Sequence, residues 1–220
     1  MGEAIGGVLG YAVGVAISPM PIIAVILMLF SRRAAANGVA FLLGWLAGLT
    51  VVSVVVLVAG LEATDGDGAG GWVKVVIGAV FLLLAVAQWR QRPQPGEEPR
   101  LPRWMASIDV LDAGKAVGMA LLLSAVNPKN LGLTIAAAAT IGAADLDAGQ
   151  DAVVVGVYVL LASVTLIVPV VGYLAARERM TPTLDAMKAW LLVNNATVMA
   201  VLFLVLGAKV LGDGIVVLTG

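Results

Sequence analysis

Cysteine and histidine are both absent from the 220-residue chain. Without cysteine the chain has no disulfides, no thiol redox chemistry and no cysteine-ligated metal. Without histidine it lacks the commonest metal ligand and the usual acid–base group near neutral pH. The sequence therefore predicts no metal centre and no cofactor.

Charge is also scarce. Charged residues make up 12% of the chain and hydrophobic residues 61%, with a mean hydropathy of +1.04. A soluble domain is typically about 25% charged and about 45–50% apolar, so the composition indicates an integral membrane protein. The net charge of −1 provides no overall field to attract nucleic acid. Residues 1–5 lack a basic region, so we expect no cleaved signal peptide.

Long apolar segments dominate what is present. A membrane-spanning helix needs about 20 mostly apolar residues, and six segments qualify. They cover residues 4–30, 37–60, 72–90, 114–143, 152–175 and 190–211. The first and fourth exceed one crossing and carry proline and polar residues near their centres. We expect an all-α integral membrane protein with six transmembrane helices, of which helices one and four are broken.

A Pro-rich, charged stretch at residues 91–112 is typical of a flexible linker. It separates residues 1–90 from residues 113–220, and each half contains three expected helices. Because three is an odd number, the halves are expected to lie in the membrane as inverted repeats. Corresponding interrupted segments in inverted halves indicate a transporter binding site.

Basic residues concentrate in alternate connections. Ten of the thirteen lie in the first, third and fifth connections or at their edges: Arg32, Arg33, Arg90, Arg92, Arg100, Arg103, Lys115, Arg177, Arg179 and Lys188. The second and fourth connections are acidic. The positive-inside rule places the basic connections in the cytoplasm and both termini outside. We expect a multi-pass protein of the cell inner membrane.

Two matching motifs interrupt the first and fourth segments. Their residues are Ser18, Pro19 and Pro21 in the first, and Asn127, Pro128, Lys129 and Asn130 in the fourth. Proline has no N–H and frees carbonyls in a helix, and irregular backbone persists in hydrocarbon only where it is buried in protein or lines water. The paired breaks predict a central substrate-binding site. The alternative is a pair of proline kinks that only shape packing.

Lys129 is a lone cation between two uncharged apolar flanks, residues 116–126 and 131–143, and no Asp or Glu lies in any expected span. A cation at this depth is costly and usually faces a bundle interior or a wet cavity. Its ammonium can bond free carbonyls and asparagines, can release its proton because dehydration disfavours the charged form, or can meet an anionic substrate. The last two would link substrate binding to protonation. Snorkelling toward a headgroup region is the competing interpretation.

Three other features are candidates for roles in packing or function. Adjacent Asn194 and Asn195 either bond between helices or line the cavity. Pro169 either kinks the fifth segment as a gate or serves packing. Small residues four apart, such as Gly44 and Gly48, allow close helix approach and would serve packing or a homodimer equally well.

The sequence Ile-Ser-Pro-Met-Pro-Ile at 17–22, with Asn-Pro-Lys-Asn at 127–130, resembles the GAP family of actinobacterial membrane proteins. These peptidoglycolipid addressing proteins are grouped with the lysine exporter superfamily. The resemblance covers the length, the six segments, the basic central linker and both motifs. It implies an exporter fold of inverted three-helix repeats and a role in moving cell-envelope glycolipids or related polar lipids toward the surface.

We therefore expect a secondary transporter that moves an anionic or polar envelope lipid or glycolipid by alternating access around a midplane site. Membrane lipids and the substrate are its expected partners, with proton coupling through Lys129. One alternative is an exporter of an amino acid or other small metabolite. Another is a non-transporting scaffold of an envelope-lipid export complex. No enzyme is expected, because the spans contain no nucleophile–base pair or carboxylate dyad.

Overall fold

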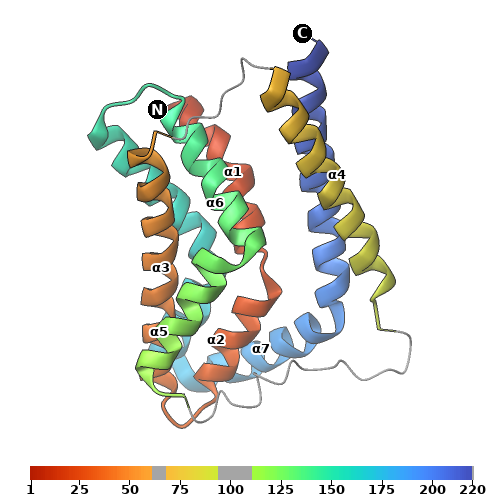
Figure 1. The fold of residues 1–220 in the computed structure, drawn as a ribbon. Coiled ribbons are helices and arrows are strands. Elements are labelled where there is room, and N and C mark those ends of the chain that lie inside the picture. The colour runs from red at the N-terminus through yellow and green to blue at the C-terminus, as the bar shows by residue number, and fades with distance from the viewer. Residues whose placement is uncertain (61–67, 94–110, 220) are drawn as a thin grey trace. The chain divides into compact units, whose positions relative to one another are not determined.

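The computed structural model describes residues 1–60, 68–93 and 111–219. This part of the chain forms helices and no strand (Figure 1). The elements in chain order are α1 (Gly2–Ala16), α2 (Pro19–Leu29), α3 (Ala34–Val58), α4 (Gly68–Arg90), α5 (Ala113–Leu121), the π-helical turn η2 (Leu122–Val126), α6 (Pro128–Gly142) and α7 (Ala148–Thr219). The predicted all-helical class is confirmed.

The chain forms two compact units. The first comprises Met1–Ala63 and Arg100–Leu192, and the second comprises Thr64–Pro99 and Val193–Gly220. The first unit thus holds α1, α2, α3, α5, η2, α6 and the first part of α7. The division into repeats at 1–90 and 113–220 stays a prediction, and most of the expected linker at 91–112 lies outside the described residues.

The expected break in the first apolar segment is present. The α1 and α2 axes differ in direction by 56°. Ile17 (φ −82°, ψ 62°) and Ser18 (φ −115°, ψ 99°) leave the helical conformation between them. Pro19 is the first residue of α2, a position that suits proline because the missing N–H would have no helical partner there.

The break in the fourth segment is also confirmed. Here α5 runs into the π-helical turn η2, and Asn127 then adopts an extended conformation (φ −60°, ψ 119°). Pro128 opens α6, as Pro19 opens α2. The Asn127 side chain caps α6 by accepting a hydrogen bond from the Lys129 N–H at 3.1 Å.

One predicted loop is wrong. The connection expected to hold Arg177 and Arg179 is helical, and α7 consists of two helices that meet at a kink at the non-helical residue Ala176 (φ −151°, ψ 60°). Met180 folds back over Gly172, where an added Cβ would lie 2.8 Å from the Met180 Cε atom. The polar residues after Ala176 suggested a loop, but they belong to an amphipathic helix that buries Leu184 and Leu191.

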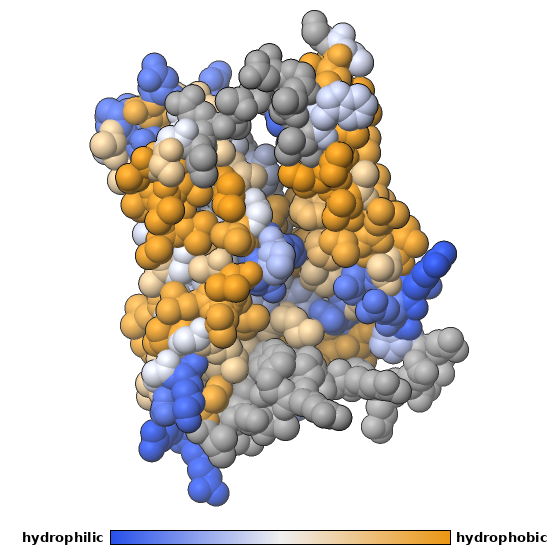
Figure 2. Space-filling view, in the orientation of Figure 1, coloured by the Kyte–Doolittle hydropathy of each residue, from blue (hydrophilic) through white to orange (hydrophobic). Residues whose placement is uncertain are grey.

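Apolar helices identify a membrane protein. Of the described helices, α3 and α7 are long and apolar enough to cross a membrane, and the bent α1–α2 pair makes a third if it counts as one crossing. Hydrophobic residues cover the middle of the first unit and hydrophilic residues gather at its two ends (Figure 2). On α3, Leu43, Val51 and Val55 are exposed. The six crossings remain a prediction.

Close packing surrounds the two breaks. α3 lies against α5, η2 and α6, and α1 lies against α6 (Figure 1). A Cβ added at Gly44 would lie 2.8 Å from the Val117 carbonyl oxygen, and one added at Gly48 would overlap the Ser124 hydroxyl. The close helix approach predicted for these glycines is confirmed. α2 is buried along nearly its whole length.

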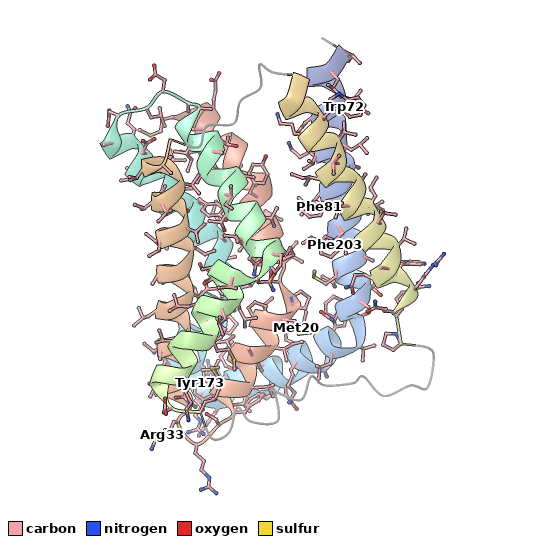
Figure 3. All side chains as sticks on the ribbon, viewed as in Figure 1. Met20, Arg33, Trp72, Phe81, Tyr173 and Phe203 are labelled. Carbon is pink, nitrogen blue, oxygen red and sulfur yellow. The ribbon has the colours of Figure 1, made fainter. Side chains whose placement is uncertain are left out.

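The second unit pairs α4 with the last part of α7. Phe81 and Phe203 face each other across this pair (Figure 3), with ring centroids 5.6 Å apart. Glycines bring the two backbones together, since a Cβ at Gly78 would lie 2.6 Å from the Leu211 nitrogen and one at Gly207 would lie 3.0 Å from the Gly78 oxygen. Small residues thus allow the two helices to approach closely along this contact.

Candidate functional site

Lys129 joins the two breaks. Its side chain lies on the first turn of α6 and the residue is only 8% exposed. The ammonium donates hydrogen bonds to the Gly14 carbonyl at 2.8 Å, the Ile17 carbonyl at 3.4 Å and the Ser18 hydroxyl at 2.6 Å. An ammonium has three N–H donors, so these acceptors use all of them. The side chain bonds free carbonyls as one interpretation expected, and it does not snorkel.

The backbone explains why these carbonyls are free. In a continuous helix the Gly14 carbonyl would accept from the N–H of Ser18, but Ser18 is extended and outside α1. The Ile17 carbonyl would accept from residue 21, which is a proline and has no N–H. The end of α1 also carries the negative pole of its helix dipole. The sequence around the first break therefore creates a site for a positive charge.

A second set of bonds locks the site. The Ser18 hydroxyl donates to Asn130 Oδ1 at 3.0 Å, and Asn130 Nδ2 donates to the Leu123 carbonyl at 2.8 Å. The Leu123 carbonyl is available because the π-helical turn directs the Asn127 N–H to Leu122 instead, at 2.9 Å. Ser18 and Asn130 are both buried. Each break therefore supplies the groups that complete the other.

Hydroxyl groups extend this network to α7. Thr134 Oγ1 donates to the Asn130 carbonyl at 2.7 Å and lies 2.9 Å from the Tyr158 hydroxyl. Thr165 Oγ1 donates to the Ala16 carbonyl at 2.7 Å, another free group at the end of α1. Sequence reasoning missed Thr134 and Tyr158. The four-residue spacing of Asn130 and Thr134 on one helical face was the available signal.

The other predicted site residues lie in several places. Pro19 and Pro21 are buried in α2, whereas Pro128 is exposed. Pro169 is buried inside α7, seven residues before the non-helical Ala176, and its gating role stays a prediction. The predicted contributions of Asn194 and Asn195 are likewise left as predictions, because both belong to the second unit.

No carboxylate is paired with Lys129 among the described residues. The ion pairs found there join Lys115 to Asp112, Lys188 to Asp185 and Lys209 to Asp213. The same part of the chain holds no group of three or more acidic, His or Cys side chains that could bind a metal ion. The site thus consists of one ammonium and neutral acceptors.

Together these observations define a helical membrane protein with two interrupted helices that meet at a buried lysine. A family model described as Sap, sulfolipid-1-addressing protein, matches residues 8–216, which include both breaks. The chain belongs to this family, in agreement with its resemblance to the glycolipid-addressing GAP proteins. No curated protein and no solved structure matched the chain.

Proposed function

We propose that the chain is a secondary transporter that moves an anionic envelope lipid, of the sulfolipid or glycolipid class, by alternating access around Lys129. The family description names a sulfolipid, and a sulfolipid presents an anionic sulfur oxyacid headgroup. The observation that carries the proposal is the buried ammonium of Lys129, which is held only by neutral acceptors at the meeting point of two broken helices.

The geometry suggests how a substrate would act. The bond from Lys129 to the Ile17 carbonyl is the longest of the three at 3.4 Å, so it is the easiest to exchange. A hydrogen bond from an ammonium to an anion is stronger than one to a neutral carbonyl. An anionic headgroup would therefore draw the ammonium from the end of α1. The hydrogen bonds of the Lys129 ammonium connect the end of α1 to α6, so their loss would favour a second arrangement of the two broken helices.

Charge supports an orientation for this cycle. In the first unit, exposed Arg33 lies at the end where α5 begins (Figure 3), and exposed Lys115 is in the first turn of α5. Exposed Arg177 lies over the ring of Tyr173, which Figure 3 shows at the same end, whereas Asp145 and Asp147 follow the other end of α6. The positive-inside rule assigns the basic end to the cytoplasm. The proposal thus includes a plasma-membrane protein with six crossings, inverted halves and both termini outside.

Reconstitution in liposomes tests the proposal. The probe is a fluorescent sulfatide, with the corresponding cerebroside, which lacks only the sulfate, as the matched uncharged lipid. Movement is followed by the loss of protection from a membrane-impermeant quencher. We expect the wild-type protein to move sulfatide faster than cerebroside, and Lys129→Met to abolish the difference.

Lys115→Met is the matched control, because that lysine side chain is 66% exposed and lies outside the site. Undiminished sulfatide movement by a folded Lys129→Met protein would remove Lys129 from the mechanism. Uptake of a labelled amino acid without lipid movement would favour the small-metabolite exporter. Absence of both activities would favour the membrane scaffold.

A further inference from the structure

We infer that the end of α1 is a monovalent-cation site whose built-in occupant is the Lys129 ammonium. Its oxygen ligands are the Gly14 and Ile17 carbonyls and the Ser18 hydroxyl. Unwound carbonyls at the C-terminal end of a half-helix are the groups that bind coupling cations in transporters. The site stands on the geometry alone, and its consequence for transport rests on the proposed function.

The contact with Asn130 fixes the direction in which the Ser18 hydroxyl donates its hydrogen bond. A hydroxyl has one hydrogen and two lone pairs. The Ser18 hydrogen is directed to Asn130 Oδ1 at 3.0 Å, so only lone pairs face the Lys129 ammonium at 2.6 Å. The Ser18 hydroxyl is therefore held as an acceptor.

The orientation of the Asn130 side-chain amide is fixed by a contact of its own. Its Nδ2 group donates to the Leu123 carbonyl at 2.8 Å, which leaves Oδ1 as the atom that meets Ser18. The π-helical turn frees the Leu123 carbonyl to accept from Asn130, and it thereby fixes the direction of the hydrogen bond between Asn130 and Ser18. As a result, the three groups around the ammonium present only acceptors.

A ring of acceptors binds a cation and repels an anion. An anionic substrate cannot replace the ammonium within these three ligands, so the ammonium has to leave them to meet the substrate. The ligands also need no sodium or potassium ion while Lys129 occupies them. In the proposed transporter, lipid movement therefore requires no alkali cation.

The test is occupation of the emptied site by a free cation. The Lys129→Ala substitution removes three methylenes and the ammonium, which together correspond to propylammonium. We expect propylammonium chloride to raise the Tm of purified Lys129→Ala protein in a saturable way, because a ligand that binds only the folded state stabilises it. Choline chloride controls for salt and 1-propanol for filling of the apolar space, and neither should have this effect.

Two further variants give the result its specificity. Wild-type and Lys115→Ala proteins should not respond to propylammonium, since their site is occupied. Adding Ser18→Ala to Lys129→Ala removes one ligand, so the half-saturating propylammonium concentration should rise by about tenfold or more. An equal response to 1-propanol, or an unchanged concentration in the double variant, would overturn the inference.

The cation site can still be tested if the Lys129→Ala protein does not fold by itself. If that protein aggregates in choline, propylammonium should restore a monodisperse species, and failure in both salts counts against the site. The sulfatide assay on the same preparations separates the two proposals. Cation binding without wild-type lipid movement would retain the site and reject transport, whereas lipid movement without cation binding would do the opposite.

Discussion

The Lys129 ammonium lies 2.6 Å from the Ser18 hydroxyl oxygen, although 111 residues separate the two in the chain. The Ser18 hydroxyl in turn donates a hydrogen bond to Oδ1 of Asn130, which is the next residue after Lys129. One serine in the first break therefore contacts two consecutive residues after the second break. This reciprocal contact makes the two interruptions a single structural feature.

Removing the Ser18 hydroxyl should destabilise the protein. Ser18→Ala leaves one N–H of the Lys129 ammonium and Asn130 Oδ1 without a buried partner, which typically costs about 1–3 kcal/mol per group. Ser163→Ala is the matched control, because Ser163 is equally buried but donates only to the Val159 carbonyl of its own helix, at 2.6 Å. Thermal unfolding monitored by tryptophan fluorescence should show the larger loss for Ser18→Ala. Equal losses would argue against the link between the breaks.

The Thr134–Tyr158 contact should behave as a coupled pair. Tyr158→Phe leaves Thr134 bonded to the Asn130 carbonyl, so we expect a loss of about 1 kcal/mol. Thr134→Val removes both Thr134 bonds and strands the buried Tyr158 hydroxyl, so it should cost more. A double-mutant cycle on the free energy of unfolding should show that the double variant loses less than the sum. Additive losses would mean that the 2.9 Å approach contributes no bond.

The approach of α3 to the second break should not tolerate a larger residue. Gly48→Ala would place a Cβ on the Ser124 hydroxyl, and overpacking typically costs about 1–3 kcal/mol. Gly10→Ala is the control, because nothing lies within 4 Å of an added Cβ there and alanine is favoured over glycine in a helix by about 1 kcal/mol. We expect Tm to fall for the first variant and to hold or rise for the second.

Ion gradients should affect sulfatide movement selectively. A sodium gradient should have no effect, because the Lys129 ammonium already occupies the carbonyl site. A pH gradient should alter the rate if the amine carries the coupled proton, and this response should disappear in Lys129→Met. Liposomes with imposed gradients measure both effects. A sodium-driven rate would contradict the cation site, and a response to pH that persists in Lys129→Met would exclude this amine as the proton carrier.

The two breaks could be predicted because proline and an isolated charge are conspicuous in apolar sequence. Pro21 even identifies the Ile17 carbonyl as free, since proline cannot donate to the residue four positions before it. The pairing of that carbonyl with Lys129 could not be predicted, because it depends on how α1 lies against α6. The position of Lys129 on the first turn after Pro128 made it a candidate, and only the fold supplied its partners.

Other features gave weaker signals. Thr134 and Tyr158 are ordinary residues for membrane helices, and their hydroxyl contact joins elements that the sequence does not pair. The helical stretch after Ala176 was missed because its charges suggested a loop. Its buried Leu184 and Leu191 lie seven residues apart, a helical spacing that only the packed structure distinguishes from chance.

Because α2 is buried in protein, its stability should not depend on the thickness of the bilayer. Nine of its eleven residues are buried, and only Met20 and Leu27 retain appreciable exposure. A helix of this length spans about 16 Å, roughly half of a typical hydrocarbon core. Lipids with longer or shorter acyl chains should therefore strain α3, whose Leu43 and Val55 face outward, and leave α2 insulated from hydrophobic mismatch.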